Sequence, residues 1–245
     1  MIQPLELSVI IPAYNEELRL PAYLAKVLEY LEAQPFSSEV IIVDDGSRDN
    51  TCALAERFAA GNSMVRLERL PQNQGKGYAV KTGMLKARGL LRLFTDADGA
   101  TPISELAGLI KTIEAGADVA VGSRALRDDC HNVKTNLHRK VMGTVFNFIV
   151  RTLTVKGIND TQCGFKLFTA KAANAVFPQQ RIPDFGFDVE ILYICHKMGY
   201  TIAEVPVNWT NIPGTKVKLF RDSLRMFKDV LKVRLNDWQG IYRDG

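Results

Sequence analysis

The chain has 245 residues, of which 47% are hydrophobic and 24% are charged, so it can form one large α/β domain and is not intrinsically disordered. No stretch reaches the ~18 uncharged apolar residues of a membrane-spanning helix, and residues 1–6 lack a signal-peptide core. Four cysteines without a Cys-x-x-Cys pair favour neither a disulfide framework nor a zinc site. We therefore expect a cytoplasmic protein that is not integral to a membrane.

The net charge of +4 is unevenly distributed along the chain. Residues 216–235 hold seven lysines and arginines against two aspartates, a local charge of +5, and the remainder is close to neutral. A basic excess confined to one segment indicates a local anionic partner and argues against nucleic-acid binding along the whole chain. We predict one domain over residues 1–212, followed by a basic, amphipathic helical segment over residues 213–245 that faces a membrane.

Short β-prone apolar runs alternate with helix-like segments along the first half of the chain. The predicted strands are residues 7–11, 40–43, 64–67, 90–94 and 119–121, and the predicted helices are residues 17–33, 49–60, 77–87 and 103–115. This alternation predicts an α/β fold with a doubly wound, mostly parallel sheet and helices on both faces. Beyond residue 121 the pattern is less regular, with helix-like segments at residues 137–153 and 188–198, and we expect it to complete the same domain.

Side chains that can bind ligands follow three of the predicted strands. Residues 12–16 (Pro-Ala-Tyr-Asn-Glu) follow the first strand, residues 44–47 (Asp-Asp-Gly-Ser) the second, and residues 96–98 (Asp-Ala-Asp) the fourth. Ligands of doubly wound sheets bind beyond the carboxyl ends of the strands. The three groups are therefore expected to converge on one edge of the sheet and to form one site.

Asp96 and Asp98 supply two carboxylates at a strand end, where hard oxygen ligands can hold Mg²⁺ or Mn²⁺ against a diphosphate. An isolated Asp-x-Asp sequence is more often a solvated turn. The other strand-end groups favour the metal site here, because they place further polar side chains at the same edge.

Two further groups fit a nucleotide at this edge. Asp45 can present a carboxylate to a base or ribose, and Gly46 allows close backbone approach, although a turn with a helix cap gives the same sequence. Lys76 stands at the start of a predicted helix, where it can meet phosphate or sugar oxygens. The alternative for Lys76 is a flexible Gly-Lys-Gly turn, since the spacing of a Walker A loop is absent.

In order and spacing, these groups resemble the family 2 inverting glycosyltransferases. The motifs that carry the resemblance in the first half are residues 9–16, 44–47, 75–77 and 96–98. Further along, the segments that look like the branch acting on dolichyl or other polyprenyl phosphates are residues 122–124, Arg139, and residues 160–168, 187–190 and 205–209. The resemblance implies a GT-A fold and a transferase that uses a nucleotide-activated sugar.

The resemblance also implies roles for single residues. Asp96 and Asp98 would handle the metal and the diphosphate, and the predicted catalytic residues are Asp98, Arg124 and Arg139, the two arginines meeting phosphate groups. The predicted donor-binding residues are Pro12, Tyr14, Glu16, Val43, Asp45, Lys76, Asp96 and Lys216.

One position departs from the mannosyltransferases of this branch. Dolichyl-phosphate mannosyltransferases usually read Asp-Ala-Asp-Leu-Gln, with the glutamine helping at the metal, whereas this chain has Gly99 and Ala100. A third protein ligand of the metal is therefore left open. The Asp-Gly-Ala-Thr sequence at residues 98–101 is similar to the dolichyl-phosphate β-glucosyltransferases, which use UDP-glucose. This similarity predicts a UDP-glucose donor and a polyprenyl-phosphate acceptor.

A phosphomonoester acceptor needs no strong protein base, because its second pKa lies at about 6 and it is largely ionised at neutral pH. Its oxygen can attack directly, and inversion of an α-linked donor gives a β-linked lipid product. Two alternatives stay open: a transferase of the same fold that takes GDP-mannose or a soluble carbohydrate acceptor, and a non-catalytic membrane-docking protein. Glu190 is predicted either to approach the sugar or to be solvated on a helix.

The basic C-terminal segment carries apolar residues at helical spacing. Phe220, Leu224, Phe227 and Leu231 predict one apolar stripe, which Leu235 continues. Such a helix either packs on the domain with a solvated basic face or lies on anionic lipid as an interfacial helix. We expect the second arrangement, which makes the protein peripheral at the cytoplasmic face of a membrane.

Overall fold

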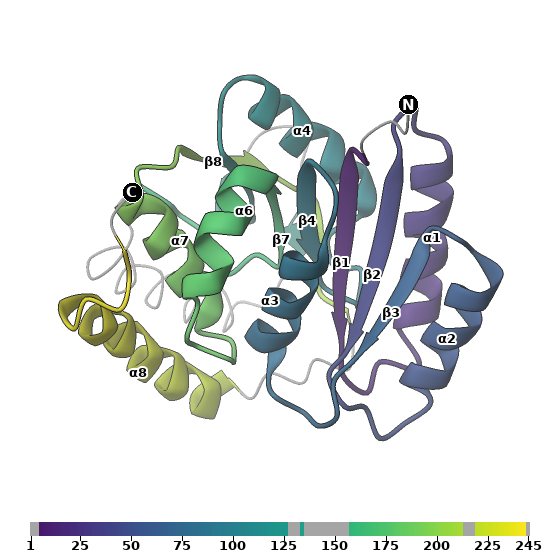
Figure 1. Cartoon of the computed structure of the whole chain (residues 1–245), viewed down its shortest axis with the longest axis horizontal. Coiled ribbons are helices and arrows are strands. Elements are labelled where there is room, and N and C mark those ends of the chain that lie inside the picture. The colour runs from purple at the N-terminus through teal and green to yellow at the C-terminus, as the bar shows by residue number, and fades with distance from the viewer. Residues whose placement is uncertain (1–4, 127–132, 135–156, 213–218, 244–245) are drawn as a thin grey trace.

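The structure is a computed structural model that describes residues 5–126, 133–134, 157–212 and 219–243. Its centre is a seven-stranded sheet in the order β3-β2-β1-β4-β7-β5-β8 (Figure 1). The strands are β1 (Leu7–Ala13), β2 (Ser38–Asp44), β3 (Val65–Arg69), β4 (Leu91–Thr95), β5 (Val119–Ser123), β7 (Phe165–Thr169) and β8 (Ile202–Pro206). A separate pair joins β6 (Val133–Lys134) to β9 (Trp209–Thr210).

The sheet is mostly parallel, as predicted. Among the seven described strands of this sheet, only β7 runs against its neighbours, since it is antiparallel to both β4 and β5. The other pairs of this sheet are parallel. The antiparallel strand comes from the irregular second half of the chain, where strands and helices do not alternate simply.

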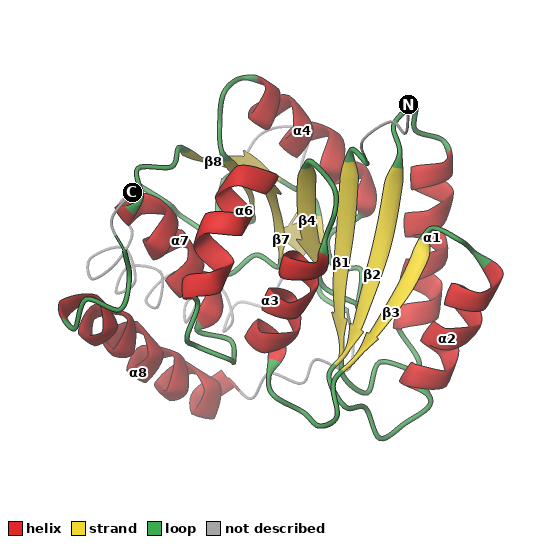
Figure 2. Cartoon of the chain, in the orientation of Figure 1, coloured by secondary structure: helices red, strands yellow, loops and turns green. Residues whose placement is uncertain are grey.

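Helices cover both faces of the sheet (Figure 2). They are α1 (Leu20–Glu32), α2 (Thr51–Gly61), α3 (Lys76–Lys86), α4 (Leu106–Glu114), α6 (Ala170–Val176), α7 (Phe187–Lys197) and α8 (Leu219–Trp238), with 3-10 turns at Ile103–Glu105 and Phe177–Gln179. Buried residues of α1, α2 and α4 form one apolar core, and those of α3, α6 and α7 form the other. The predicted helix at residues 137–153 lies outside the described residues.

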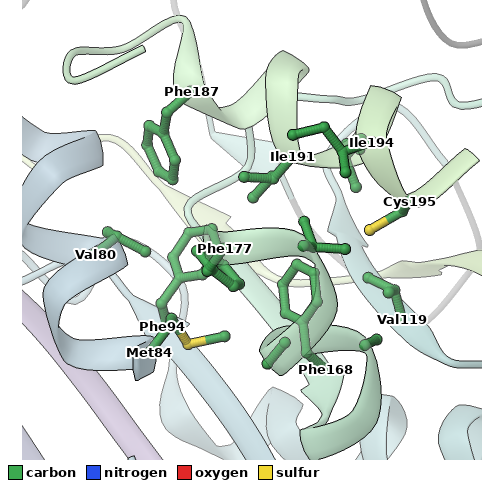
Figure 3. Close-up of a cluster of buried hydrophobic side chains, with 14 of the residues drawn as sticks. Val80, Met84, Phe94, Val119, Phe168, Phe177, Phe187, Ile191, Ile194 and Cys195 are labelled. Atoms are coloured by element: carbon green, nitrogen blue, oxygen red, sulfur yellow. The ribbon is translucent and has the colours of Figure 1, made fainter. Parts of the chain in front are cut away.

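All seven residues of β1 are buried, because both faces of this central strand are covered by helices. The core on the α7 side contains four phenylalanines, Phe94, Phe168, Phe177 and Phe187 (Figure 3), whose neighbouring ring centroids are 5.3–6.3 Å apart. Phe94 is two residues before Asp96, and Phe187 opens α7. The rigid aromatic core therefore supports the edge of the sheet where the strand-end carboxylates lie.

Helix α8 has two apolar faces instead of the single stripe that the sequence predicts. Val230 and Val233 are fully buried, and Val233 belongs to the core that includes α7. The predicted stripe points elsewhere, since its described members Phe227, Leu231 and Leu235 are 38–49% exposed, and the next residue at this spacing, Trp238, is 84% exposed. Within the described residues, no helix is both long and apolar enough to cross a membrane.

Candidate active site

The loops after β1 and β2 are joined by direct hydrogen bonds. The N–H of Asn15, a residue with a left-handed φ of 51°, donates to Ser47 Oγ at 2.9 Å, and the N–H of Arg48 donates back to Asn15 Oδ1 at 2.7 Å. The N–H of Glu16 donates to Thr51 Oγ1 at 2.6 Å. These bonds bring the first two strand-end groups together, as the sequence predicts.

Asp45 holds the loop that precedes α3. Its carboxylate accepts from Asn73 Nδ2 at 2.9 Å and from the N–H groups of Gln74 and Gly75 at 2.8 and 2.9 Å. Burial raises the pKa of Asp45 against the effect of these N–H donors, and the nearby carboxylate of Asp44 adds to the rise. Asp45 therefore shapes the predicted nucleotide site by fixing its loop.

A cavity of about 480 Å³ lies beside this loop, lined by Asp44, Gly46, Ser47, Arg48, Cys52, Arg69, Leu70, Pro71, Gln72 and Asn73. Gly46 has a φ of +69°, and a Cβ at this position would lie 2.6 Å from the carbonyl carbon of Gln72. The wall of the cavity thus requires a glycine. Asp44 Oδ1 is buried and accepts no hydrogen bond within the described part of the chain.

Two glycines shape the loop that carries Asp96 and Asp98. A Cβ on Gly164 would lie 2.2 Å from Asp96 Oδ2, so the absence of a side chain there makes room for the Asp96 carboxylate. Gly99 has a φ of +66°, and a Cβ at this position would lie 2.6 Å from Cδ2 of the Tyr23 ring. The leucine found at this place in mannosyltransferases would not fit this turn, which gives the Gly99 departure a physical reason.

Two cations of the chain neutralise these carboxylates. Lys76 Nζ lies 2.5 Å from Asp96 Oδ1, and Arg19 Nη1 lies 3.7 Å from Asp98 Oδ2. Arg19 also pairs with Glu16, its Nε donating to Oε2 at 2.6 Å. Burial raises the pKa of Asp98, and the neighbouring Asp96 carboxylate raises it further.

The Asp96 and Asp98 carboxylates suit a divalent cation, because they are hard oxygen donors close enough to repel each other. Among the described residues, no group of three carboxylate, histidine or cysteine side chains forms a complete metal site. This leaves the third protein ligand open, because amide and backbone carbonyl oxygens can also bind such a cation.

Arg124 follows β5 and forms a bidentate pair with Asp160. Its Nε and Nη2 donate to the two carboxylate oxygens at 2.7 and 2.8 Å, and its backbone N–H donates to Oδ2 at 2.9 Å. The guanidinium also lies 5.5 Å from the centre of the Trp209 ring. The predicted motifs at residues 122–124, 160–168 and 205–209 therefore meet in space. Arg139 and Lys216, which the sequence also assigns to the site, lie outside the described residues.

The remaining donor-binding residues differ in how much side chain they expose. Tyr14 is half-buried and Glu16 is buried beside Arg19, both at the end of β1. Pro12 and Val43 are buried, and Val43 packs towards α3 in the core. A contact between Val43 and a nucleotide can therefore come only from its main chain.

Glu190 is not solvated, which was one of the two arrangements that the sequence predicts for it. It is fully buried and accepts hydrogen bonds from the N–H groups of Arg181 and Ile182, at 2.9 and 2.8 Å, and from the Tyr242 hydroxyl at 2.6 Å. Burial raises its pKa, although the Tyr242 hydroxyl opposes the rise. Glu190 thus anchors the segment before α7 and is shielded from solvent.

Sequence reasoning missed three parts of the site: Arg19, Gly164, and a buried ion pair between Lys166 and Asp188. Gly164 and Lys166 lie within the motif at residues 160–168, and Asp188 lies within residues 187–190. The sequence therefore marks their positions but predicts no role for them. Arg19 is three residues after Glu16, a spacing that favours an ion pair on a turn or helix.

The model of the family described as "Glycosyl transferase family 2" matches residues 8–177. A dolichyl-phosphate beta-glucosyltransferase of Dictyostelium discoideum is 42% identical and aligns with 99% of this chain and 78% of its own length. The enzymes of the same name from Homo sapiens and Saccharomyces cerevisiae are 41% and 38% identical over 97% of this chain.

Solved structures share the fold at low sequence identity. Glucosyl-3-phosphoglycerate synthase from Mycobacterium tuberculosis in complex with UDP has a TM-score of 0.70 at 18% identity, over 93% of this chain and 79% of that one. The same enzyme with Mn²⁺, UDP and glucosyl-3-phosphoglycerate has a TM-score of 0.66 at 19% identity, over 94% and 79%. Mannosyl-3-phosphoglycerate synthase from Rubrobacter xylanophilus has a TM-score of 0.72 at 16% identity, over 96% and 75%.

These neighbours confirm the predicted GT-A fold, with its mostly parallel sheet between two layers of helices. The family match covers more than half of the chain, and the curated relatives align over nearly all of it. The chain is a glycosyltransferase and belongs to glycosyl transferase family 2.

Proposed function

We propose that this protein transfers glucose from UDP-glucose to dolichyl phosphate or a similar polyprenyl phosphate, with inversion to a β-linked product and with help from Mg²⁺ or Mn²⁺. The observation that carries the proposal is the pair of carboxylates of Asp96 and Asp98 at the end of β4, beside the loop that Asp45 fixes. The names of the curated relatives support the glucose and the lipid acceptor. The neighbours with Mn²⁺ and UDP support the metal and the nucleotide.

The charge around Asp96 supports a diphosphate ligand. Four carboxylates, on Glu16, Asp96, Asp98 and Asp188, face three cations, on Arg19, Lys76 and Lys166, so the centre carries one net negative charge. A divalent cation held by Asp96 and Asp98 would turn this into one net positive charge and would supply the charge that a departing UDP needs. Lys76 would then face the diphosphate together with that ion.

Arg124 suits the acceptor phosphate. Asp160 occupies Nε and Nη2 of its guanidinium, so Nη1 is the nitrogen that remains for a phosphate oxygen. The Asp160 pair also fixes the plane of the guanidinium, which lowers the entropy lost when a phosphate binds. We propose Arg139, which the sequence predicts to meet phosphate groups, as a second ligand of this phosphate. The phosphate dianion would attack directly, because it is already ionised at neutral pH.

The outer face of α8 supports a membrane-bound acceptor. Phe227, Leu231, Leu235 and Trp238 are exposed on it, and basic residues at Lys228, Lys232 and Arg234 are exposed alongside. An interfacial helix has this pattern of apolar side chains flanked by lysine and arginine. We propose that this face lies on anionic lipid at the cytoplasmic face of a membrane, while the side of α8 that carries Val230 and Val233 packs on the domain.

Liposome sedimentation tests the membrane contact. Leu231→Ser combined with Leu235→Ser should bind anionic liposomes more weakly and use membrane-embedded acceptor more slowly, with unchanged activity on a short, soluble prenyl phosphate. Melting should stay close to wild type, because both side chains already face solvent. A matched control is Val230→Ser, which should lower stability by about 2–4 kcal/mol. Liposome binding by the double variant equal to wild type would assign the contact to another surface.

The donor and acceptor are tested with a panel. Purified protein is incubated with UDP-glucose or GDP-mannose, and with dolichyl phosphate, 3-phosphoglycerate or glucose as acceptor. We expect a glycolipid product and the highest kcat/KM with UDP-glucose and dolichyl phosphate. A higher kcat/KM with GDP-mannose would replace the donor and keep the reaction class. Transfer to the soluble acceptors alone would show that the acceptor is not a lipid. The absence of both transfer and UDP-sugar hydrolysis, with metal present, would indicate a non-catalytic protein.

A further inference from the structure

A fully buried ion pair lies directly behind the Asp96 loop. Lys166 on β7 is 0% exposed and Asp188 in the first turn of α7 is 3% exposed, and the Lys166 ammonium donates to Asp188 Oδ1. The same ammonium donates to the carbonyl of Cys163 at 2.7 Å and lies 5.2 Å from the centre of the Phe94 ring. Its charge is thus surrounded by partners inside an apolar core.

Stability alone does not account for this pair. Moving two charges out of water costs several kcal/mol per ion, and well-packed apolar residues of similar volume are often as stable or more stable. Lys166 shares its face of β7 with Phe168 and lies over Phe94, and both of these side chains are fully buried in one apolar core. An apolar side chain at residue 166 would therefore suit this strand. The ion pair requires another explanation.

The pair adjoins the cation that faces Asp96. Lys76 Nζ lies 6.0 Å from the centre of the Phe187 ring, and Phe187 is the residue before Asp188. The Asp96 carboxylate pairs with the Lys76 ammonium, and the Asp188 carboxylate also lies near enough to attract it. Lys76 accordingly has two anionic neighbours, one in the metal-binding pair and one in the core.

The backbone around Lys76 is held tightly against the same segment. A Cβ on Gly75 would lie 2.4 Å from the carbonyl oxygen of Pro183, and a Cβ on Gly77 would lie 2.6 Å from Phe187 Cβ. The N–H of Tyr78 donates to the Pro183 carbonyl at 3.0 Å. The start of α3 is thus fixed on residues 183–187, and the remaining freedom is in the Lys76 side chain itself.

We propose that Asp188, held in place by Lys166, is a positioning residue for Lys76: it keeps the Lys76 ammonium beside the donor diphosphate when a divalent cation takes over the Asp96 carboxylate. This inference rests on the proposed function, because it assumes a nucleoside diphosphate at this site. Without Asp188, the ammonium would be repelled by the incoming cation and would lose its place. Asp188 thereby lets one lysine serve the site both before and after the cation arrives.

The test measures UDP binding by calorimetry in the presence of Mn²⁺, without any acceptor. Asp188→Asn alone would leave Lys166 buried and unpaired, so the informative variant is Lys166→Met with Asp188→Asn, which removes both charges at similar volume. We expect this double variant to melt near the wild-type temperature and to bind UDP about 10-fold more weakly, the lower end of the range for groups that orient a metal site. The donor KM should rise with it, and the acceptor KM should not.

A double-mutant cycle shows whether the effect passes through Lys76. Lys76→Met should weaken UDP binding in the wild-type background and should add nothing in the Lys166→Met/Asp188→Asn background. Glu39→Gln is the matched control, a buried carboxylate with cationic partners at the opposite end of the sheet, and it should bind UDP as the wild type does.

Wild-type UDP affinity in the Lys166→Met/Asp188→Asn variant, or losses that multiply with that of Lys76→Met, would overturn the inference and leave the proposed function intact. A wild type that binds neither UDP nor GDP with Mn²⁺ present would overturn the proposed function and the inference together.

Discussion

The two ends of β2 each carry buried acidic side chains, and their surroundings are opposite. At the amino end, Glu39 accepts hydrogen bonds from Ser8 Oγ at 2.7 Å and from Arg66 and Arg88 at 2.8 Å. At the carboxyl end, Asp44 and Asp45 lie next to each other, with Asp45 bound to backbone N–H groups and Asp44 Oδ1 unpaired within the described residues.

This difference distinguishes a carboxylate that stabilises the fold from carboxylates of the proposed binding site. Burial alone would raise the pKa of Glu39, but the Arg88 and Ser8 hydrogen bonds and the Arg66 charge lower it overall. The pKa values of Asp45 and Asp98 are raised, by burial and by neighbouring carboxylates. The carboxyl end of the sheet therefore holds acidic groups at a cost in free energy that a bound cation or ligand can offset.

The largest effect is expected at Asp98. Asp98→Asn should lower transfer about 100-fold or more, because the proposed metal site would lose one of its two carboxylates. The melting temperature should not fall, since the substitution removes repulsion from Asp96. Transfer assays with Mn²⁺ and thermal melting check both expectations. Turnover equal to wild type in this variant, or undiminished turnover in EDTA, would show that transfer does not need a metal at this site.

Arg124 allows stability and phosphate binding to be separated. Arg124→Ala should cost about 2 kcal/mol of stability, because it leaves the Asp160 carboxylate buried without its charged donors. Arg124→Ala with Asp160→Asn should recover most of that stability and should still use lipid phosphate poorly, as seen in the acceptor KM and kcat. Full recovery of acceptor kinetics in the double variant would make Arg124 a purely structural residue.

The opposite result is expected at the amino end of β2. Glu39→Gln should lower the free energy of unfolding by about 1–3 kcal/mol, because charged hydrogen bonds to Arg66 and Arg88 weaken. Donor and acceptor kinetics should match the wild type at a temperature where both proteins are folded. A changed donor KM would show that the two ends of the strand are not independent.

The smallest effect is a pH dependence of opposite sign at the two ends. The lowered pKa of Glu39 gives stability at neutral pH that is lost as the pH falls through the ordinary glutamate range of about 4 towards the folded-state pKa. The raised pKa of Asp98 costs stability at neutral pH, and this cost disappears as the pH falls through the folded-state pKa. Denaturant melts between pH 3 and 7 should give Glu39→Gln a lower free energy of unfolding than wild type, and Asp98→Asn an equal or higher one. Both differences should shrink at low pH. A Glu39→Gln gap that widens on acidification would contradict this assignment.

Much of the fold follows from local patterns. Continuous apolar runs predicted β1 and β2, because strands covered on both faces need apolar residues throughout, and the observed strands extend one or two residues beyond the predicted ends. The convergence of residues 12–16, 44–47 and 96–98 followed from the rule for carboxyl ends of parallel strands. Strand β7 was not predicted as an insertion between β4 and β5, because pairing partners far apart in sequence leave no local signal.

The site was predicted in part. Asp96, Asp98 and Lys76 were named because charged groups at strand and helix ends are visible in the sequence, and they do lie together. Gly164, Lys166 and Asp188 gained their roles only through the tertiary packing of β7 and α7 against the Asp96 loop. The face of α8 was also hidden, because Val230 and the Phe227–Leu231 pair give two overlapping apolar patterns on one helix, and only packing decides which is buried.

The proposed reaction is metal-assisted transfer of glucose from a nucleotide to a lipid phosphate at the carboxyl edge of the sheet. The most direct measurement incubates wild type and Asp98→Asn with UDP-[¹⁴C]glucose, dolichyl phosphate and Mn²⁺, with and without EDTA, and determines the radioactivity in the lipid extract and the anomeric configuration of the product. We predict a β-linked glucosyl lipid from the wild type with Mn²⁺ and almost none in the other arms. A lipid product of equal yield with EDTA or from Asp98→Asn would rule out the metal at this site, and an α-linked product would rule out inversion.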